Sequence, residues 1–243
     1  MSNMFGNLNT HDVAKSEDVV FGAGFIKDTG VYPFTVKQAW GITSTYGAMG
    51  VHLELLLGDG STYREDVYVT NRAGEPFYTK NGSDKKLPLP GYITINELCL
   101  VLTGKGLAEL PQEIKKVKIR DKDTQTDVPT DVPVIVDLLG LEGKVAILKT
   151  RENKMQKNES TQKWDVPTND ERFTNNIEKF YGTDDRTANE KAGDGQAAHM
   201  QKWLDVNNGK TRDKFKEVKG APKSGAPATK GAAGSNSTDL FND

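Results

Sequence analysis

Apolar and polar residues alternate along much of the first half of the chain, which is typical of half-buried β-strands. The clearest case runs from Val51 to Leu57, where polar His52 and Glu54 separate the apolar positions. Gly58-Asp59-Gly60 follows as a tight-turn signal, and alternation resumes from Ser61 to Val69. These segments predict a β-hairpin with Val67 and Val69 inward. Its outward positions on the second strand are Arg64, Asp66 and Tyr68.

A further strand is predicted before this hairpin, from Val31 to Ile42. Strict alternation places Lys37 on the face opposite to its large apolar side chains. We expect those side chains, on one shared face, to be Tyr32, Phe34, Val36 and Trp40.

The pattern breaks between Thr70 and Gly91, where Asn, Gly, Pro and Lys predict a long loop. Loops of this length in a compact domain are usually functional or disordered. Next, Thr94-Ile95-Asn96-Glu97 matches a capping box before the apolar run Leu98 to Leu102. We therefore expect a short helix that ends at Gly104.

Alternation returns after the helix. Ile114 to Arg120 predicts a strand, and two more apolar strands, Val132 to Leu139 and Val145 to Thr150, flank a turn at Gly140 to Gly143. Lys163-Trp164 could add another strand. Beyond it, Asp170 to Tyr181 and Gln196 to Val206 could form short helices.

This order of elements predicts a mainly β protein. Strands with one intervening helix favour a small barrel plugged by that helix, and the oligonucleotide/oligosaccharide-binding (OB) barrel is the commonest of these. We expect an N-terminal arm at 1–20, an OB-like domain at 21–165, a partly helical extension at 166–208, and a disordered linker and tip at 209–243.

The C-terminal region differs in composition from the rest. Gly209 to Thr238 consists largely of Gly, Ala, Pro, Ser, Thr and Lys, which cannot bury enough apolar surface to offset the entropy of ordering. A Leu-Phe pair flanked by two Asp residues then ends the chain. We interpret this tip as a partner-binding peptide on a tether; the alternative is a disordered terminus without a function. The residues concerned are Asp239, Leu240, Phe241 and Asp243.

Bulk properties set limits on the function. The 243 residues carry a net charge of −2, so any argument for a nucleic-acid partner must rest on local clusters. One cysteine, Cys99, excludes an intrachain disulfide. No run approaches the roughly 18 apolar residues of a membrane span, and the N-terminus lacks a signal-peptide pattern. We expect a soluble protein of the cytoplasm, with no membrane partner.

The sequence lacks a convincing catalytic motif. The Gly-rich stretch at Phe21 to Phe25 lacks the third glycine of a dinucleotide fingerprint, and Gly104-Lys105 lacks the other residues of a phosphate loop. Three scattered histidines and one cysteine do not form a zinc set. We expect a protein that is not an enzyme and uses no metal or cofactor.

Basic and aromatic residues are mixed on outward strand positions and in the long loop. This pairing grips single-stranded nucleic acid, because cations follow phosphates while rings stack on bases. Core packing of the rings and simple solvation of the lysines are the alternatives. The candidate binding residues are Lys37, Trp40, Arg64, Tyr68, Arg72, Phe77, Tyr78, Lys80, Lys85, Lys86, Lys116, Lys118 and Arg120.

Several stretches resemble single-stranded DNA-binding proteins of tailed bacteriophages. They are Gly24-Phe25, Thr29-Gly30-Val31-Tyr32, Thr35-Val36-Lys37-Gln38-Ala39-Trp40, Tyr68-Val69-Thr70-Asn71-Arg72-Ala73-Gly74 and Lys85-Lys86-Leu87-Pro88-Leu89-Pro90-Gly91. The resemblance covers about Phe21 to Thr150. It implies an OB-type barrel that coats single-stranded DNA during replication, recombination and repair in an infected host cell. It also implies a flexible C-terminal arm that recruits a polymerase, helicase or nuclease. This tip departs from that pattern, since it carries only two Asp residues and ends in Asn-Asp rather than Phe.

Two other functions stay open. A structural β-protein of a virion or scaffold could use the tail as an anchor. A nuclease would need clustered carboxylates for metal ions, which the sequence does not offer. A homo-oligomer is possible.

Overall fold

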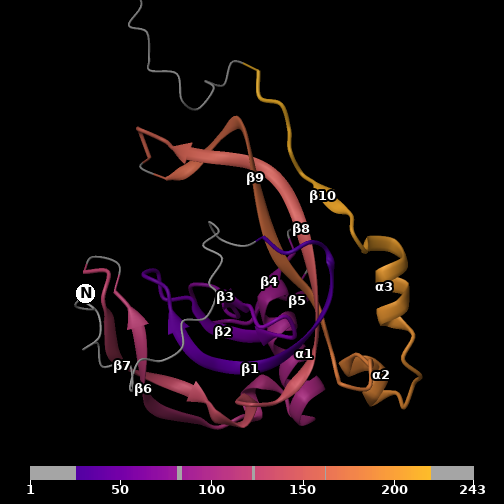
Figure 1. The fold of residues 1–243 in the computed structure, drawn as a ribbon. Helices are drawn as coiled ribbons and strands as arrows, with labels where there is room; N and C mark the ends of the chain where they lie inside the picture. Colours follow the sequence, from indigo (N-terminus) through magenta and orange to yellow (C-terminus); the bar gives the residue numbers. More distant parts are fainter. Residues whose placement is uncertain (1–25, 81–83, 122–123, 162, 220–243) are drawn as a thin grey trace, which may run out of the picture.

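The computed structural model describes residues 26–80, 84–121, 124–161 and 163–219, and within them the protein is mainly β (Figure 1). The predicted N-terminal arm and the tip at Asp239–Asp243 lie outside these residues. The elements are β1 (Gly30–Thr43), β2 (Met49–Leu57), β3 (Thr62–Tyr68), β4 (Phe77–Thr79), β5 (Lys86–Pro88), α1 (Pro90–Thr103), the 3-10 turn η1 (Leu107–Glu109), β6 (Gln112–Arg120), β7 (Asp127–Ile135), the 3-10 turn η2 (Val136–Leu138), β8 (Glu142–Lys157), β9 (Trp164–Tyr181), α2 (Ala188–Ala192), α3 (His199–Asn207) and β10 (Thr211–Asp213).

β1, β2 and β3 form an antiparallel meander in the main sheet, with β3 at its edge. The predicted β2–β3 hairpin is confirmed: Val51, Leu53, Leu55 and Leu57 point into the core. The turn between the strands is closed by the Asp59 carboxylate, which accepts bonds from Lys27 and Ser61. These contacts lower the pKa of Asp59 to about 2.

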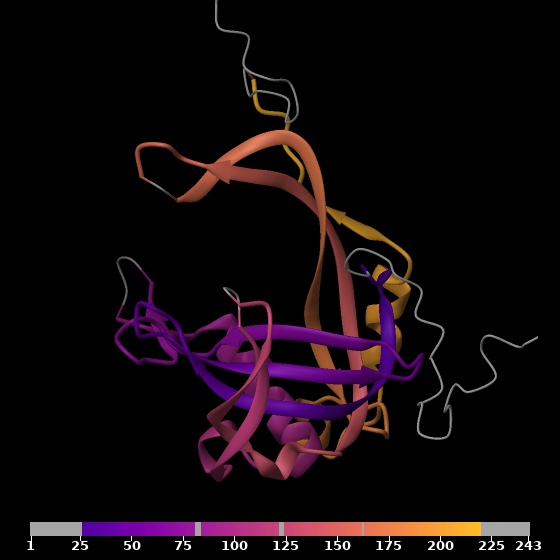
Figure 2. The same cartoon turned by 60° about the vertical axis from the view of Figure 1, so that its left-hand side comes forward.

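Helix α1 covers one face of this meander and supplies Ile95, Leu98 and Cys99 to the main core (Figure 2). The helix begins at Pro90, four residues before the predicted capping box. Proline is favoured at the first helical position, and the Thr94 hydroxyl donates to the Pro90 carbonyl inside the helix instead of capping it. Gly91 is required here, because a Cβ would lie 2.1 Å from the Tyr68 carbonyl oxygen. The predicted end at Gly104 is confirmed by its left-handed φ of 75°.

The β6–β7 hairpin belongs to the same sheet, because Val134 of β7 pairs with Trp40 in the second half of β1. Val132 and Val134 enclose Trp40 in a second, smaller cluster. The prediction that Trp40 shares a face with Phe34 and Val36 is wrong, because a β-bulge at Lys37 shifts the alternation by one residue. Strand β7 also ends before its predicted limit, since residues 136–138 turn as a 3-10 helix.

Strands β8 and β9 form a long antiparallel hairpin that rises from the core and arches over the β1–β2–β3 sheet (Figures 1 and 2). The helix predicted over Asp170 to Tyr181 is wrong, because these residues form the second half of β9. The boundary expected at residue 165 therefore falls inside this hairpin. We call residues 149–161 and 163–175 of β8, β9 and their connection the arch.

Backbone pairing does not close the main sheet within the described residues. Among them, β3 pairs only with β2, and β9 pairs only with β8. A side chain bridges the two open edges: the Glu65 carboxylate on β3 accepts hydrogen bonds from the Ile177 backbone N–H on β9 and from the Tyr63 hydroxyl, 2.7 Å away. Burial in this seam raises the pKa of Glu65.

The C-terminal part of the described chain folds back along the hairpin. Helix α3 confirms most of the helix predicted over Gln196 to Val206. Glu190 fixes its start by accepting bonds from the Ala198 and His199 backbone N–H groups. Burial opposes ionisation of Glu190, but these bonds and that of Thr187 lower its pKa to about 2.

The linker predicted from Gly209 is shorter than expected, because residues 210–219 lie along the arch as an extended segment that we call the strap. β10 pairs parallel with β8. Asn153 then exchanges two hydrogen bonds with the Lys216 backbone, and Asn169 does the same with Val218. Asn175 clamps the Lys27 backbone in the same way near the start of the described chain.

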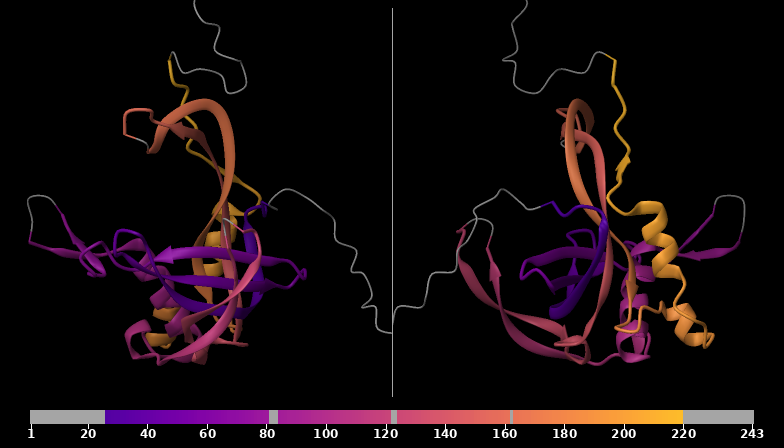
Figure 3. Two further views of the ribbon diagram at one scale, coloured as in Figure 1. Left: turned by 90° about the vertical axis from the view of Figure 1, so that its left-hand side faces the viewer. Right: turned by 45° about the vertical axis from the view of Figure 1, so that its right-hand side comes forward.

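The predicted long loop between β3 and α1 contains a small hairpin, β4–β5, that projects beyond the sheet (Figure 3, left). We call residues 77–80 and 84–88 the finger.

Candidate nucleic-acid interface

The structure separates the sequence-predicted residues into three groups. Trp40, Arg64 and Tyr68 belong to the face of the β1–β2–β3 sheet opposite α1, while Lys37 is exposed in the β1 bulge. Phe77, Tyr78, Lys80, Lys85 and Lys86 belong to the finger, with Arg72 in the turn before it. Lys116, Lys118 and Arg120 lie on β6.

The first group is less available to a base than expected. The Trp40 side chain is buried, and the His52 ring stacks on it with centroids 4.0 Å apart. The Arg64 Nε donates to Glu54 Oε1 over 2.6 Å, so this cation is paired. Tyr68 is 44% exposed and is the large aromatic side chain available on this face of β3.

Exposed rings and cations are concentrated at the end of the sheet that carries the finger. The Arg72 guanidinium lies 4.6 Å from the ring centroid of Tyr46, which is 69% exposed in the β1–β2 turn. In the finger, the Lys86 ammonium lies 4.3 Å from the Phe77 ring, and Tyr78 is exposed. Each of these places can offer a ring to a base beside a cation for a phosphate.

A short turn holds this cluster in place. Asn71 Oδ1 accepts bonds from the Ala73 and Glu75 backbone N–H groups, and Asn71 Nδ2 donates to the Phe77 carbonyl. Gly74 adopts a left-handed φ of 80° in this turn. One asparagine thus fixes both Arg72 and the base of the finger.

The third group faces away from the other two. Val117 and Ile119 of β6 turn toward the Trp40 cluster. Because side chains alternate along a strand, Lys116, Lys118 and Arg120 point to the outer surface of the β6–β7 hairpin. There they lie opposite Asp131, Pro129 and Asp127 of β7.

The arch contributes residues that the sequence did not single out. A cleft of about 520 Å³ separates β3 from β9, and Arg64, Arg172 and Phe173 are among its lining residues. The Phe173 ring lies 5.4 Å from the Lys149 ammonium, and Trp164 is 69% exposed at the start of β9. The sequence did not single out Phe173, because its spacing to Ile177 is that of a helix.

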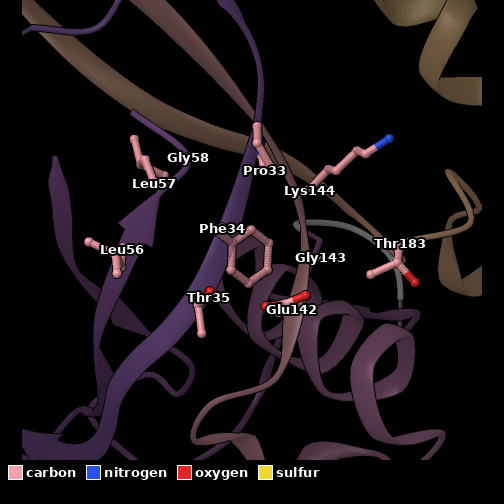
Figure 4. A pocket seen from close by; sticks show the side chains of 10 residues that line it. All are labelled: Pro33, Phe34, Thr35, Leu56, Leu57, Gly58, Glu142, Gly143, Lys144 and Thr183. Carbon is pink, nitrogen blue, oxygen red and sulfur yellow. The ribbon is translucent and has the colours of Figure 1, made fainter. Parts of the chain in front are cut away.

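Other cavities lie away from this cluster. A cleft of about 370 Å³ lies beside Phe34, and Glu142 and Lys144 are its ionisable lining residues. Figure 4 shows the side chains that line it. Lys144 pairs with Asp185. Another cleft, of about 450 Å³ between the β1–β2 end and the start of α1, has a mostly apolar lining that includes Ile42, Met49 and Tyr92.

The described residues contain no group of three His, Cys, Asp or Glu side chains placed to hold a metal ion. Burial raises the pKa of the Cys99 thiol to about 12, so this side chain is a small core residue at neutral pH. None of the helices in the described ranges has the length and apolar character needed to cross a bilayer.

No protein-family model and no curated protein sequence matches the chain.

Proposed function

We propose that the protein binds single-stranded DNA of any sequence and protects it during phage DNA replication, recombination and repair. The observation that carries this proposal is a set of rings and cations at one end of an open sheet face: exposed Tyr46 with Arg72, half-buried Phe77 with Lys86, and exposed Tyr78. Rings with an exposed face accept any base, and cations beside them accept any phosphate, so such a surface needs no particular sequence.

We further propose that β1, β2, β3, β8 and β9 form an OB-like barrel plugged by α1. The Glu65 carboxylate bridges the gap between β3 and β9, where a fully closed barrel has backbone hydrogen bonds. OB folds bind oligonucleotides over strands 2 and 3, between two loops. Here the β1–β2 turn with Tyr46 and the arch with Phe173 occupy the corresponding places.

The bound DNA strand would then run from the finger across β3 and under the arch. Tyr68 continues the row of exposed rings along β3, and the cleft beside Arg172 and Phe173 receives the strand at the other end. Along β3 alone this path is about 20 Å long, at about 3.3 Å per residue. Sites of about 4–16 nucleotides are usual for one OB fold.

The test is a titration of labelled oligothymidylate, followed by fluorescence anisotropy at several salt concentrations. We expect affinity to fall with salt with a log–log slope of about −0.7 for each phosphate contacted. We also expect weaker binding to a duplex of the same length. A flat salt response, or equal affinity for duplex and single strand, would disprove the proposal. Hydrolysis of the DNA with magnesium would show an enzyme instead.

The proposed recruitment of replication proteins rests on the tip, Asp239–Asp243. A single buried aromatic anchor often carries most of such a contact, and Phe241 is the candidate. Replacing Phe241 with Ala should leave the melting temperature and DNA affinity unchanged and abolish capture of a polymerase or helicase partner. Unchanged capture would show that the tip is not the docking peptide.

A further inference from the structure

Hydrogen-bond acceptors line the middle of the sheet face over which the strand would pass. Cross-strand pairing places Gln38 beside Glu54 and Arg64, and places Trp40 beside His52 and Asp66. Glu54 accepts a bond from Arg64, and Asp66 Oδ1 accepts one from His52 Nδ1 over 2.5 Å. We call Gln38, Glu54 and Asp66 the acceptor floor.

Part of this acceptor capacity is unused. Within the described residues, Gln38 Oε1 is buried and has no hydrogen-bond partner. Asp66 Oδ2 also lacks a partner in this part of the chain, and the Asp66 side chain is 54% exposed. Buried polar side-chain atoms without a partner are uncommon, and each needs an explanation such as a water molecule or a ligand.

Charge makes this floor unsuitable for phosphate. Glu54 offsets the charge of Arg64, and Asp66 adds an exposed carboxylate beside His52. Arg72 lies near the finger and Arg172 lies at the arch, at the two ends of the path. If the phosphates of the DNA strand contact these cations, its bases face the acceptor floor.

We infer, on the basis of the proposed function, that the acceptor floor favours bases with an exocyclic amino group, so cytosine-rich strands bind more tightly than thymine-rich ones. The cytosine N4 amino group donates a hydrogen bond, and Asp or Glu side chains accept it. Thymine presents the O4 acceptor at the same position. That oxygen would meet an acceptor and leave both groups without a donor, which costs binding free energy.

The test compares oligodeoxycytidylate with oligothymidylate of equal length, by competition at fixed salt and mildly alkaline pH. We expect the cytidylate to bind at least about fivefold more tightly, the discrimination of one good base contact. Oligomers of N4,N4-dimethylcytosine keep the ring but lose both amino hydrogens. They should lose this advantage without any change to the protein.

The matched variant is Asp66→Asn, which removes the charge at nearly constant shape and gives the position a donor. It should bring the two affinities to within about twofold, mainly by improving thymidylate binding. Asp127→Asn, on the outer side of β7, serves as the control and should leave the ratio unchanged. Circular dichroism establishes that each variant is folded.

The outcomes separate this inference from the proposed function. If neither oligomer binds at low salt, the proposed function fails. If both bind but the cytidylate has no advantage, or keeps it after dimethylation or in Asp66→Asn, the acceptor floor does not select bases and general binding still stands.

Discussion

At the scale of single residues, a side chain's surroundings decide what it can contribute, and Tyr78 and Trp40 show the contrast. Both are aromatic, and both were predicted to stack on bases. Trp40 is 5% exposed and already stacked on His52, whereas Tyr78 is 46% exposed in the finger. A change at Tyr78 should therefore affect DNA binding, and a change at Trp40 should affect the stability of the fold.

We expect Tyr78→Ala to weaken binding to oligothymidylate by about 1–3 kcal/mol, the value of one base stack, with an unchanged melting temperature. Ile114→Ala, which shortens an exposed apolar side chain on β6, is the control and should leave affinity unchanged. In contrast, Trp40→Ala should destabilise the fold by about 3–5 kcal/mol, because it empties the second cluster. A stability loss in Tyr78→Ala with normal binding would show that this ring serves packing.

Glu65 links stability to pH through its buried position between β3 and β9. Because burial raises its pKa in the folded state, the folded protein favours the protonated carboxyl. Its contribution to stability is therefore complete below the ordinary pKa of 4.5 and is lost as the pH rises through the raised value.

We expect Glu65→Gln to raise the melting temperature at neutral pH and to change it little near pH 4 (about the ordinary glutamate value). Thermal unfolding followed by circular dichroism across this range measures the difference. The comparison is Glu97→Gln, in helix α1, which removes the charge that pairs with Lys179 of β9. This variant should not raise the melting temperature at neutral pH. A gain for Glu65→Gln that is equal at both pH values would show that ionisation is not the cause.

At the scale of elements, alternation of apolar residues predicted β1, β2, β3 and β6 well, because each packs one face on the core. It failed where a bulge interrupts the ladder. The bulge at Lys37 moved Trp40 to the other face, and a register shift near Glu178 gave β9 the helical spacing of Phe173, Ile177 and Phe180. A sequence carries no clear local signal for such an inserted residue.

Polar sequence also concealed structure. The finger and the strap have few core side chains, so they were predicted to be a loop and a linker. The arch also has few, and its part from Asp170 onward was predicted to be helical. The arch and the finger are ordered by backbone pairing of their strands. The strap adds side-chain hydrogen bonds between distant segments to its pairing with β8, such as Asn153 with Lys216, 63 residues apart. The finger's rings were found as candidates because the sequence around them is too polar to bury them easily. Tyr46 and Phe173 were missed.

The asparagine bridges predict how the strap is held. Asn153→Ala should release residues 214–219 and cost about 1–3 kcal/mol, since removing a buried amide leaves its backbone partners unpaired. Hydrogen exchange should increase at Lys216, and trypsin should cut the strap sooner. Asn175→Ala is the matched control: it should loosen the segment at Lys27 and leave the strap protected. Equal protection of the strap in both variants would show that β10 alone holds it.

At the scale of the whole molecule, positive charge is divided between two surfaces. The finger offers Lys80, Lys85 and Lys86, while the outer side of β6 offers Lys116, Lys118 and Arg120, which lie opposite two aspartates. Of these two surfaces, the finger is the one that shares an end of the molecule with the exposed rings.

Replacing the three finger lysines with Ala should lower the affinity and reduce the magnitude of the salt slope by about 0.7 for each phosphate that is no longer bound. The same number of replacements at Lys116, Lys118 and Arg120 should change the slope less, although the net charge falls equally. Salt titrations of both triple variants measure this. A larger effect on β6 would place the strand on the outer side of the β6–β7 hairpin.

The strap also has a mechanical consequence. It runs along the arch parallel to β8 and is fixed by β10 and then by Asn153 and Asn169. Its bonds lie across its direction, so a pull along the strap strains them together, whereas a sideways pull breaks them one at a time. A protein that grips the C-terminal end and moves would therefore load the arch lengthwise. That tension would act on the element that overhangs the proposed DNA path, and the force at which the strap yields would depend on the direction of travel.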